Sequence, residues 1–160
     1  MSADPATLAS LPAEAREIVR QLELAPLPHE GGFFRNTLAS EHSSAIYYLL
    51  AAGDFSALHR LNSPEVYHWY AGSALNMLVL NPDGSTSEHR LGPDLAAGER
   101  PQLIVPADCW HGSAPAGSWA LVGTTMAPPF SWDGFELGSR EELCEEYPAA
   151  RDAIRQLTRA

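Results

Sequence analysis

The middle of the chain alternates short apolar segments with turn residues. One such turn, Asn81–Gly84, favours a hairpin, because Pro and Gly readily adopt the backbone angles that tight turns need. Segments of strand length, spaced about ten residues apart and joined by turns, are typical of an antiparallel sandwich or barrel. The predicted strands are Ser44–Ala51, Val66–Tyr70, Ala74–Leu80, Ser87–Leu91, Gln102–Val105 and Trp119–Met126.

Both ends of the chain carry helical patterns instead. Over residues 12–23 apolar side chains recur at roughly helical spacing, and Pro12 suits a first helical turn. Over residues 139–158, Ser139 with Glu142 three positions later resembles a capping box. We therefore predict short helices on either side of an all-β middle.

Length, composition and charge restrict the classes of function. With 160 residues, 45% of them apolar, the chain is expected to form one domain over residues 1–160 with its β core at roughly 30–138. All ten basic residues are arginines, so chemistry that needs a lysine amine is excluded, and we expect no lysine-linked or nucleotide cofactor. The net charge of −10 argues against nucleic-acid binding, which relies on a basic surface.

The sequence also predicts where the protein resides. Met1–Ser10 lacks the basic and continuous apolar regions of a signal peptide, and no stretch approaches the roughly 18 apolar residues of a membrane span. Cys109 and Cys144 are too few and too far apart for a disulfide framework. We expect a cytoplasmic protein without a membrane partner.

Strand parity brings chemically useful side chains together. Since alternate residues of a strand share a face, Glu65, Tyr67 and Trp69 point to one side and His68 to the other. His59 lies on the preceding segment, across a turn. We therefore expect His59 and Glu65 to meet inside the barrel.

The sequence around these residues resembles the two cupin motifs. The first motif, G-x5-H-x-H-x3,4-E-x6-G, is matched around His59 and Glu65, with Leu61 in place of the second histidine. The second, G-x5-P-x-G-x2-H-x3-N, is resembled by the segment that contains His111, with a longer first gap and with Pro115 in place of the asparagine.

The wider pattern resembles one uncharacterised cupin family, which is similar in fold to the dTDP-4-keto-6-deoxyhexose 3,5-epimerases. The resemblance covers roughly residues 14–158. It implies a mainly β, double-stranded β-helix jelly roll with short helices at both ends, usually a homodimer. The segments that carry it are His29–Arg35, Ala57–Leu61, Glu65–Gly72, Val105–Trp110 and Leu121–Gly123.

Two imidazoles and one carboxylate suit a divalent metal ion. His59, Glu65 and His111 would bind Fe, Mn, Ni or Zn and leave coordination positions open for water or substrate. The leading hypothesis is a metal-assisted isomerase or oxygenase that acts on a small polar, sugar-like or keto substrate.

Two alternatives remain open. In a metal-free epimerase or isomerase, to which the segment Ala57–Leu61 is similar, His59 would be the general base and Tyr67 the acid. In the other alternative, the cavity binds a small metabolite without catalysis. His29 with Glu30 could line the cavity of a neighbouring subunit. The residues predicted to contact the ligand are Trp69, Trp110, Met77 and Arg60.

Overall fold

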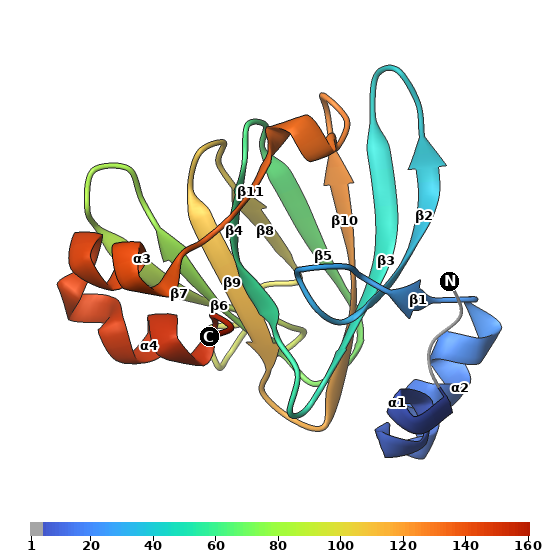
Figure 1. The fold of residues 1–160 in the computed structure, drawn as a ribbon. Coiled ribbons are helices and arrows are strands. Elements are labelled where there is room, and N and C mark those ends of the chain that lie inside the picture. Colours follow the sequence, from blue (N-terminus) through green and yellow to red (C-terminus); the bar gives the residue numbers. More distant parts are fainter. Residues whose placement is uncertain (1–4) are drawn as a thin grey trace.

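Two antiparallel sheets face each other across a shared core in the computed structural model, which describes residues 5–160 (Figure 1). Residues 1–4 of the segment examined for a signal peptide lie outside the described residues. The first sheet has the order β1 (Ala25–Pro26), β2 (Phe33–Ala39), β3 (Ser44–Ala51), β10 (Trp119–Met126), β5 (Glu65–Gly72) and β8 (Gln102–Val105). The second has the order β11 (Phe135–Leu137), β4 (Ser56–Leu61), β9 (Trp110–Pro115), β6 (Leu75–Leu80) and β7 (Thr86–Leu91). The predicted mainly β jelly roll is confirmed.

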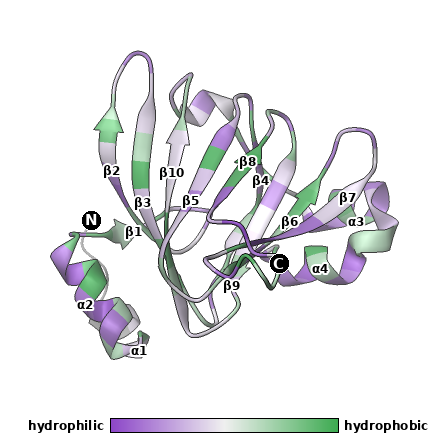
Figure 2. Cartoon of the chain, turned by 180° about the vertical axis from the view of Figure 1, so that it is seen from behind, coloured by the Kyte–Doolittle hydropathy of each residue, from purple (hydrophilic) through white to green (hydrophobic). Residues whose placement is uncertain are grey.

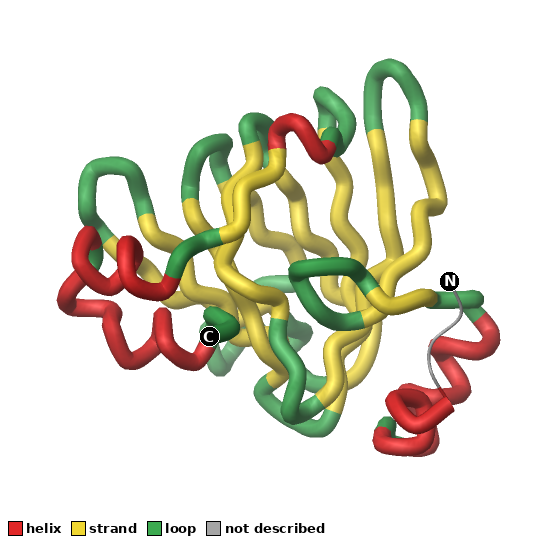
Figure 3. Tube along the Cα trace, in the orientation of Figure 1, coloured by secondary structure: helices red, strands yellow, loops and turns green. Residues whose placement is uncertain are grey.

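Helices from the two ends of the chain cover the outer faces of the two sheets (Figure 3). Helix α2 (Ala13–Gln21) packs on the six-stranded sheet, where Val19 belongs to one apolar cluster with Leu49. Around its turns α2 alternates hydrophilic and hydrophobic residues, as a helix with one face on a sheet must (Figure 2). A short helix that the sequence pattern did not predict, α1 (Pro5–Ser10), precedes it.

At the other end, α3 (Arg140–Glu146) and α4 (Arg151–Gln156) cover the five-stranded sheet, joined by a 3-10 turn at Pro148–Ala150. The predicted cap is present, since Oγ of Ser139 accepts a hydrogen bond from the backbone N–H of Glu142. Among the described residues, no helix combines the length and the apolar character that crossing a bilayer requires.

The side chains between the sheets follow strand parity. Tyr67 and Met77, from opposite sheets, belong to one buried cluster together with Tyr48 and Val105. All six predicted strands are present, with ends that differ by at most two residues.

Strands β1, β2, β4, β9 and β11 were not among the predicted strands, and β2 and β9 show two different reasons. After Phe34, the side chains of β2 are exposed, so its hydrophobic signal is weak. The sequence of β9, Trp-His-Gly-Ser-Ala-Pro, contains glycine and proline, which usually mark a turn.

Candidate metal centre

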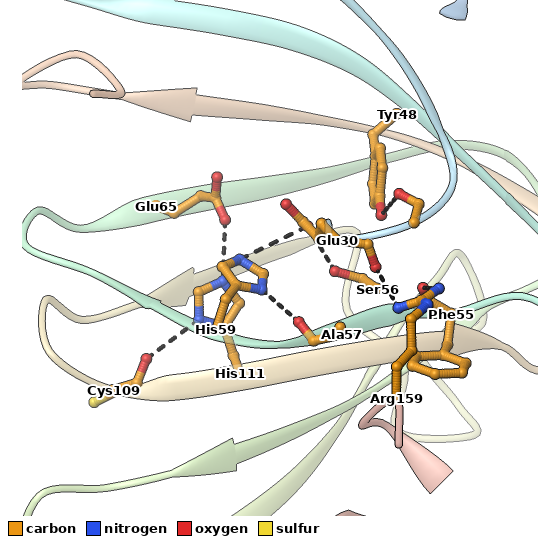
Figure 4. A network of polar contacts seen from close by, with 11 residues as sticks. Glu30, Tyr48, Phe55, Ser56, Ala57, His59, Glu65, Cys109, His111 and Arg159 are labelled. Carbon is orange, nitrogen blue, oxygen red and sulfur yellow. Dashed lines mark hydrogen bonds and ion pairs between the residues drawn. The ribbon is translucent and has the colours of Figure 1, made fainter. Parts of the chain in front are cut away.

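His59, Glu65 and His111 converge in the space between the two sheets (Figure 4). His59 on β4 and His111 on β9 are cross-strand partners in the five-stranded sheet, whereas Glu65 begins β5 in the opposite sheet. One ligand atom from each of the three side chains lies within 4.8 Å of the other two, and all three residues are buried. The structure thus brings together the three predicted metal ligands.

A β-bulge in β4 helps to aim these side chains. Ser56 pairs with Ser113 and His59 with His111, so three steps along β4 correspond to two steps along β9. Because residues three apart in a regular strand point to opposite faces, the extra residue lets both Ser56 and His59 face the interior.

His59 is held as a neutral imidazole whose Nε2 is available to bind a ligand. Its Nδ1 donates to the carbonyl oxygen of Ala57 at 2.7 Å, which leaves the lone pair on Nε2. Burial, followed by the charge of His111, lowers the pKa of His59 to about 3. At neutral pH a metal ion would therefore meet little competition from a proton at this nitrogen.

Glu65 supplies the negative charge of the centre. Nε2 of His111 donates to its Oε1 across 3.1 Å. Burial by itself would raise the pKa of Glu65, but this hydrogen bond and the charges of the two histidines outweigh burial and lower it. Glu65 is therefore an ionised carboxylate in a buried site.

Glu30 joins the same centre from the loop between β1 and β2. Its Oε1 lies 3.7 Å from Nε2 of His59 and accepts a 2.6 Å hydrogen bond from Oγ of Ser56. Burial and then the charge of Glu65 raise the pKa of Glu30 to about 7. The sequence left open that Glu30, with His29, lines a neighbouring subunit's cavity. In the structure, Glu30 lines the cavity of its own chain.

Contacts from distant parts of the chain hold the Glu30 loop in place. Arg159, near the C-terminus, donates to the carbonyl oxygen of Glu30 and to Oδ1 of Asp54, each at 2.8 Å. Oδ2 of Asp54 accepts from the backbone N–H of Gly32 at 2.9 Å. Gly31 has a φ of +107°, and a Cβ on it would lie 2.3 Å from the carbonyl oxygen of Phe55, so only glycine fits there.

Glu30, His59 and Glu65 line a cavity of about 130 Å³, whereas His111 is not part of its lining. Tyr67 reaches it from β5, and burial, followed by the charge of Glu65, raises the pKa of Tyr67 well above its usual range. Tyr67 is thus a protonated donor. Leu61, which stands in place of the motif's second histidine, forms an apolar part of the wall. The lining also includes Phe130 and Trp132, which are 37% and 51% exposed.

The four predicted ligand contacts do not line this cavity. Trp69 and Met77 face inward but belong to the packed core, and the indole N–H of Trp69 donates to the carbonyl oxygen of Ser73. Arg60 and Trp110 lie on the outer face, where the guanidinium sits 4.5 Å from the centre of the indole ring. Arg60 adjoins His59 and Trp110 adjoins His111 in sequence. Because successive residues of a strand point to opposite faces, Arg60 and Trp110 point away from the cavity.

Comparisons with known proteins place this chain in a family. The chain matches the family described as Cupin superfamily (DUF985) over residues 16–138. A structural-genomics protein from Shewanella oneidensis is 39% identical with a TM-score of 0.85, over 89% of this chain and 96% of that one. A hypothetical protein from Leishmania major is 26% identical with a TM-score of 0.84, over 92% and 99% of the two chains.

More distant structures share the fold alone. A mutant of Bacillus subtilis oxalate decarboxylase is 14% identical with a TM-score of 0.59, over 85% of this chain and 38% of that one. No curated protein matches the chain. On the match over residues 16–138 and the likeness to the Shewanella protein, the chain belongs to the cupin superfamily, in the family DUF985.

Proposed function

We propose that this chain is a small-molecule enzyme in which His59, Glu65 and His111 hold a divalent metal ion, either Fe, Mn, Ni or Zn. Its reaction is an isomerisation or an oxygenation of a small polar, sugar-like or keto substrate. The observation that carries the proposal is the convergence of the three ligand atoms within 4.8 Å beside a cavity.

The donor set fits such an ion. Metal–ligand bonds to nitrogen and oxygen are about 2.0–2.2 Å long, so two donors on one ion are at most about 4.4 Å apart. The three ligand atoms lie within 4.8 Å of one another, and Nε2 of His111 and Oε1 of Glu65 are 3.1 Å apart. A neutral imidazole on His59 and an ionised carboxylate on Glu65 are also the protonation states that bind metals.

Residues of the chain would position the substrate and limit its access to water. A metal ion at this position supplies Lewis acidity toward a carbonyl or hydroxyl oxygen. Tyr67, protonated and buried, can donate a hydrogen bond to a ligand oxygen in the cavity. Leu61 and Met126 line the same cavity and limit access of water to it.

Metal analysis tests the proposal directly. Untagged protein purified without chelators is compared with His111→Ala and with a control, His68→Ala, whose imidazole lies on the outer face of β5 and contacts Oγ1 of Thr125. We expect near-stoichiometric metal in the parent and the control, and little in His111→Ala. A parent that stays metal-free after incubation with Fe(II), Mn(II), Ni(II) and Zn(II) would overturn the proposal.

A metal-free isomerase with His59 as general base is the second candidate. In its favour, Oε1 of Glu30 lies 3.7 Å from Nε2 of His59 and can stabilise a protonated imidazole. Against it, a group with a pKa of about 3 is a weak base at neutral pH. Turnover that survives chelation and disappears in His59→Ala would establish this candidate instead.

A further inference from the structure

We propose that the cavity beside His59 and Glu65 selects small organic cations: molecules of single-ring size that carry an ammonium group and no phosphate or carboxylate. The inference deepens the proposed function, on which it rests for the identity of the binding site. It follows from the charges, the aromatic rings and the size of the cavity.

Among residues 5–160, two carboxylates and no arginine side chain line the cavity. Glu30 and Glu65 both line it, and the sequence has no lysine. Three arginines on nearby segments are engaged elsewhere: Arg35 pairs with Glu23, Arg60 with Glu136, and Arg159 with Asp54. In the metal-free protein an anionic ligand would therefore meet two carboxylates without the guanidinium fork that usually binds phosphate or carboxylate.

One carboxylate oxygen is free to accept a hydrogen bond from the ligand. Oε1 of Glu30 is engaged by Ser56, whereas Oε2 accepts no hydrogen bond from the side chains and backbone of residues 5–160. The Glu30 side chain is 12% exposed, although it lies beside fully enclosed His59. An ammonium group in the cavity would give this oxygen a charged donor.

Aromatic side chains line the same cavity as the two carboxylates. Trp132 and Phe130 line the exposed part of the cavity and pack edge to face, with ring centres 5.0 Å apart. Phe34, Tyr48 and Tyr67 contribute further rings to the lining. Because ring faces attract cations, a lining of aromatic and acidic side chains favours a positive charge over a negative one.

The volume sets the size of the ligand. The cavity measures about 130 Å³, slightly less than the roughly 150 Å³ protein cavity that encloses one benzene ring. A single six-membered ring is thus the largest group that can be enclosed. A nucleotide-linked sugar would leave most of its atoms outside.

A matched series of probes tests the selection by charge. Cyclohexylammonium, cyclohexanol and cyclohexanecarboxylate have the same ring and differ in charge. Their binding to metal-free protein is measured by calorimetry at low salt and about pH 8, where the amine stays charged. We expect the ammonium compound to bind at least about tenfold more tightly than the carboxylate. Equal or tighter binding of the carboxylate, or binding of none of the three, would overturn the proposal.

Two variants locate the selection. Glu30→Gln keeps the shape of the side chain and should abolish the preference for the cation, while the affinity for cyclohexanol stays unchanged. Trp132→Leu changes a residue that is 51% exposed and should weaken binding of the ammonium compound more than that of the alcohol. Glu88→Gln, on the exposed face of β7, is the matched control and should behave as the parent does. A preference that persists in both cavity variants would contradict the proposal.

Metal content measured on the same preparations separates the two proposals. Metal binding without a preference for the cation would overturn this inference and leave the proposed function standing. A preference for the cation in a protein that takes up no metal would overturn the proposed metal centre and support this inference.

Discussion

Nε2 of His111 donates to Oε1 of Glu65 across 3.1 Å, and this hydrogen bond joins the two sheets inside the barrel (Figure 4). The two residues lie 46 positions apart and on strands of different sheets. The contact forms only when the sandwich closes. The geometry of the candidate metal centre and the closure of the fold therefore depend on the same pair.

Removing Glu65 should therefore destabilise the metal-free protein. Without this carboxylate the ring N–H of His111 is buried without an acceptor, so we expect Glu65→Ala to lower the free energy of unfolding by about 1–3 kcal/mol. The control is Glu136→Ala, which removes an ion pair with Arg60 at the surface. Since exposed pairs contribute about 0–1 kcal/mol, urea unfolding should show little change for the control. Equal losses in the two variants would contradict the prediction.

The pKa values of Glu30 and His59 predict opposite effects of pH on stability. The pKa of Glu30 rises from an ordinary 4.5 to about 7, so its contribution to stability is lost as the pH rises through that range. The pKa of His59 falls from an ordinary 6.5 to about 3, so stability is lost as the pH falls below 6.5. Between pH 4.5 and 6.5 the two effects largely cancel.

Glu30→Gln removes one of the two titrating groups and should reveal how His59 alone makes stability depend on pH. In chelator-treated protein, we expect the free energy of unfolding of this variant to increase with pH up to 6.5. The steepest slope for one group is about 1.4 kcal/mol per pH unit. The parent should stay nearly flat over the same interval. Denaturant unfolding across the range checks this, and parallel profiles for the parent and the variant would show that Glu30 does not titrate as described.

Strand parity together with the cupin motifs was enough to predict that His59, Glu65 and His111 converge. The alternation of β5 can be read from the sequence and orients Glu65, whereas His59 and His111 were found through the two motifs. The same rule explains why two of the predicted ligand contacts do not line the cavity. Arg60 and Trp110 adjoin His59 and His111 in sequence, and for that reason they occupy the opposite face of the sheet.

Glu30 could not be placed by such reasoning. It lies in a loop without hydrophobic periodicity, and Arg159 and Asp54, from two other parts of the chain, hold that loop. The only available signal was the resemblance carried by the segment His29–Arg35. Loop positions that depend on several distant hydrogen bonds are fixed by tertiary structure, not by local pattern.

Restoring the histidine that the motif lacks should strengthen metal binding. Leu61 is buried, lines the cavity and lies two residues after His59 on the same face of β4. We expect Leu61→His to raise affinity for Zn(II) or Mn(II) by at least about tenfold, because it adds a nitrogen donor. The same change should destabilise the metal-free protein by about 2 kcal/mol, since it buries a polar group. Competition with a chromogenic chelator measures the affinity, and Leu61→Met controls for the change of side chain.

Ser56 on β4 and Ser113 on β9 are cross-strand partners. Removing the hydroxyl of Ser56 should lower the free energy of unfolding, whereas removing that of Ser113 should not. Oγ of Ser56 donates to Glu30 at 2.6 Å, whereas Oγ of Ser113 is buried without a hydrogen-bond partner among the described residues. Loss of a hydrogen bond to a carboxylate costs about 1.5–3 kcal/mol, so Ser56→Ala should lower the free energy of unfolding by that amount. Ser113→Ala removes an unpaired buried polar group and should leave stability unchanged or raise it by up to about 1 kcal/mol. A loss in Ser113→Ala as large as that in Ser56→Ala would show that an ordered water molecule pairs with this hydroxyl.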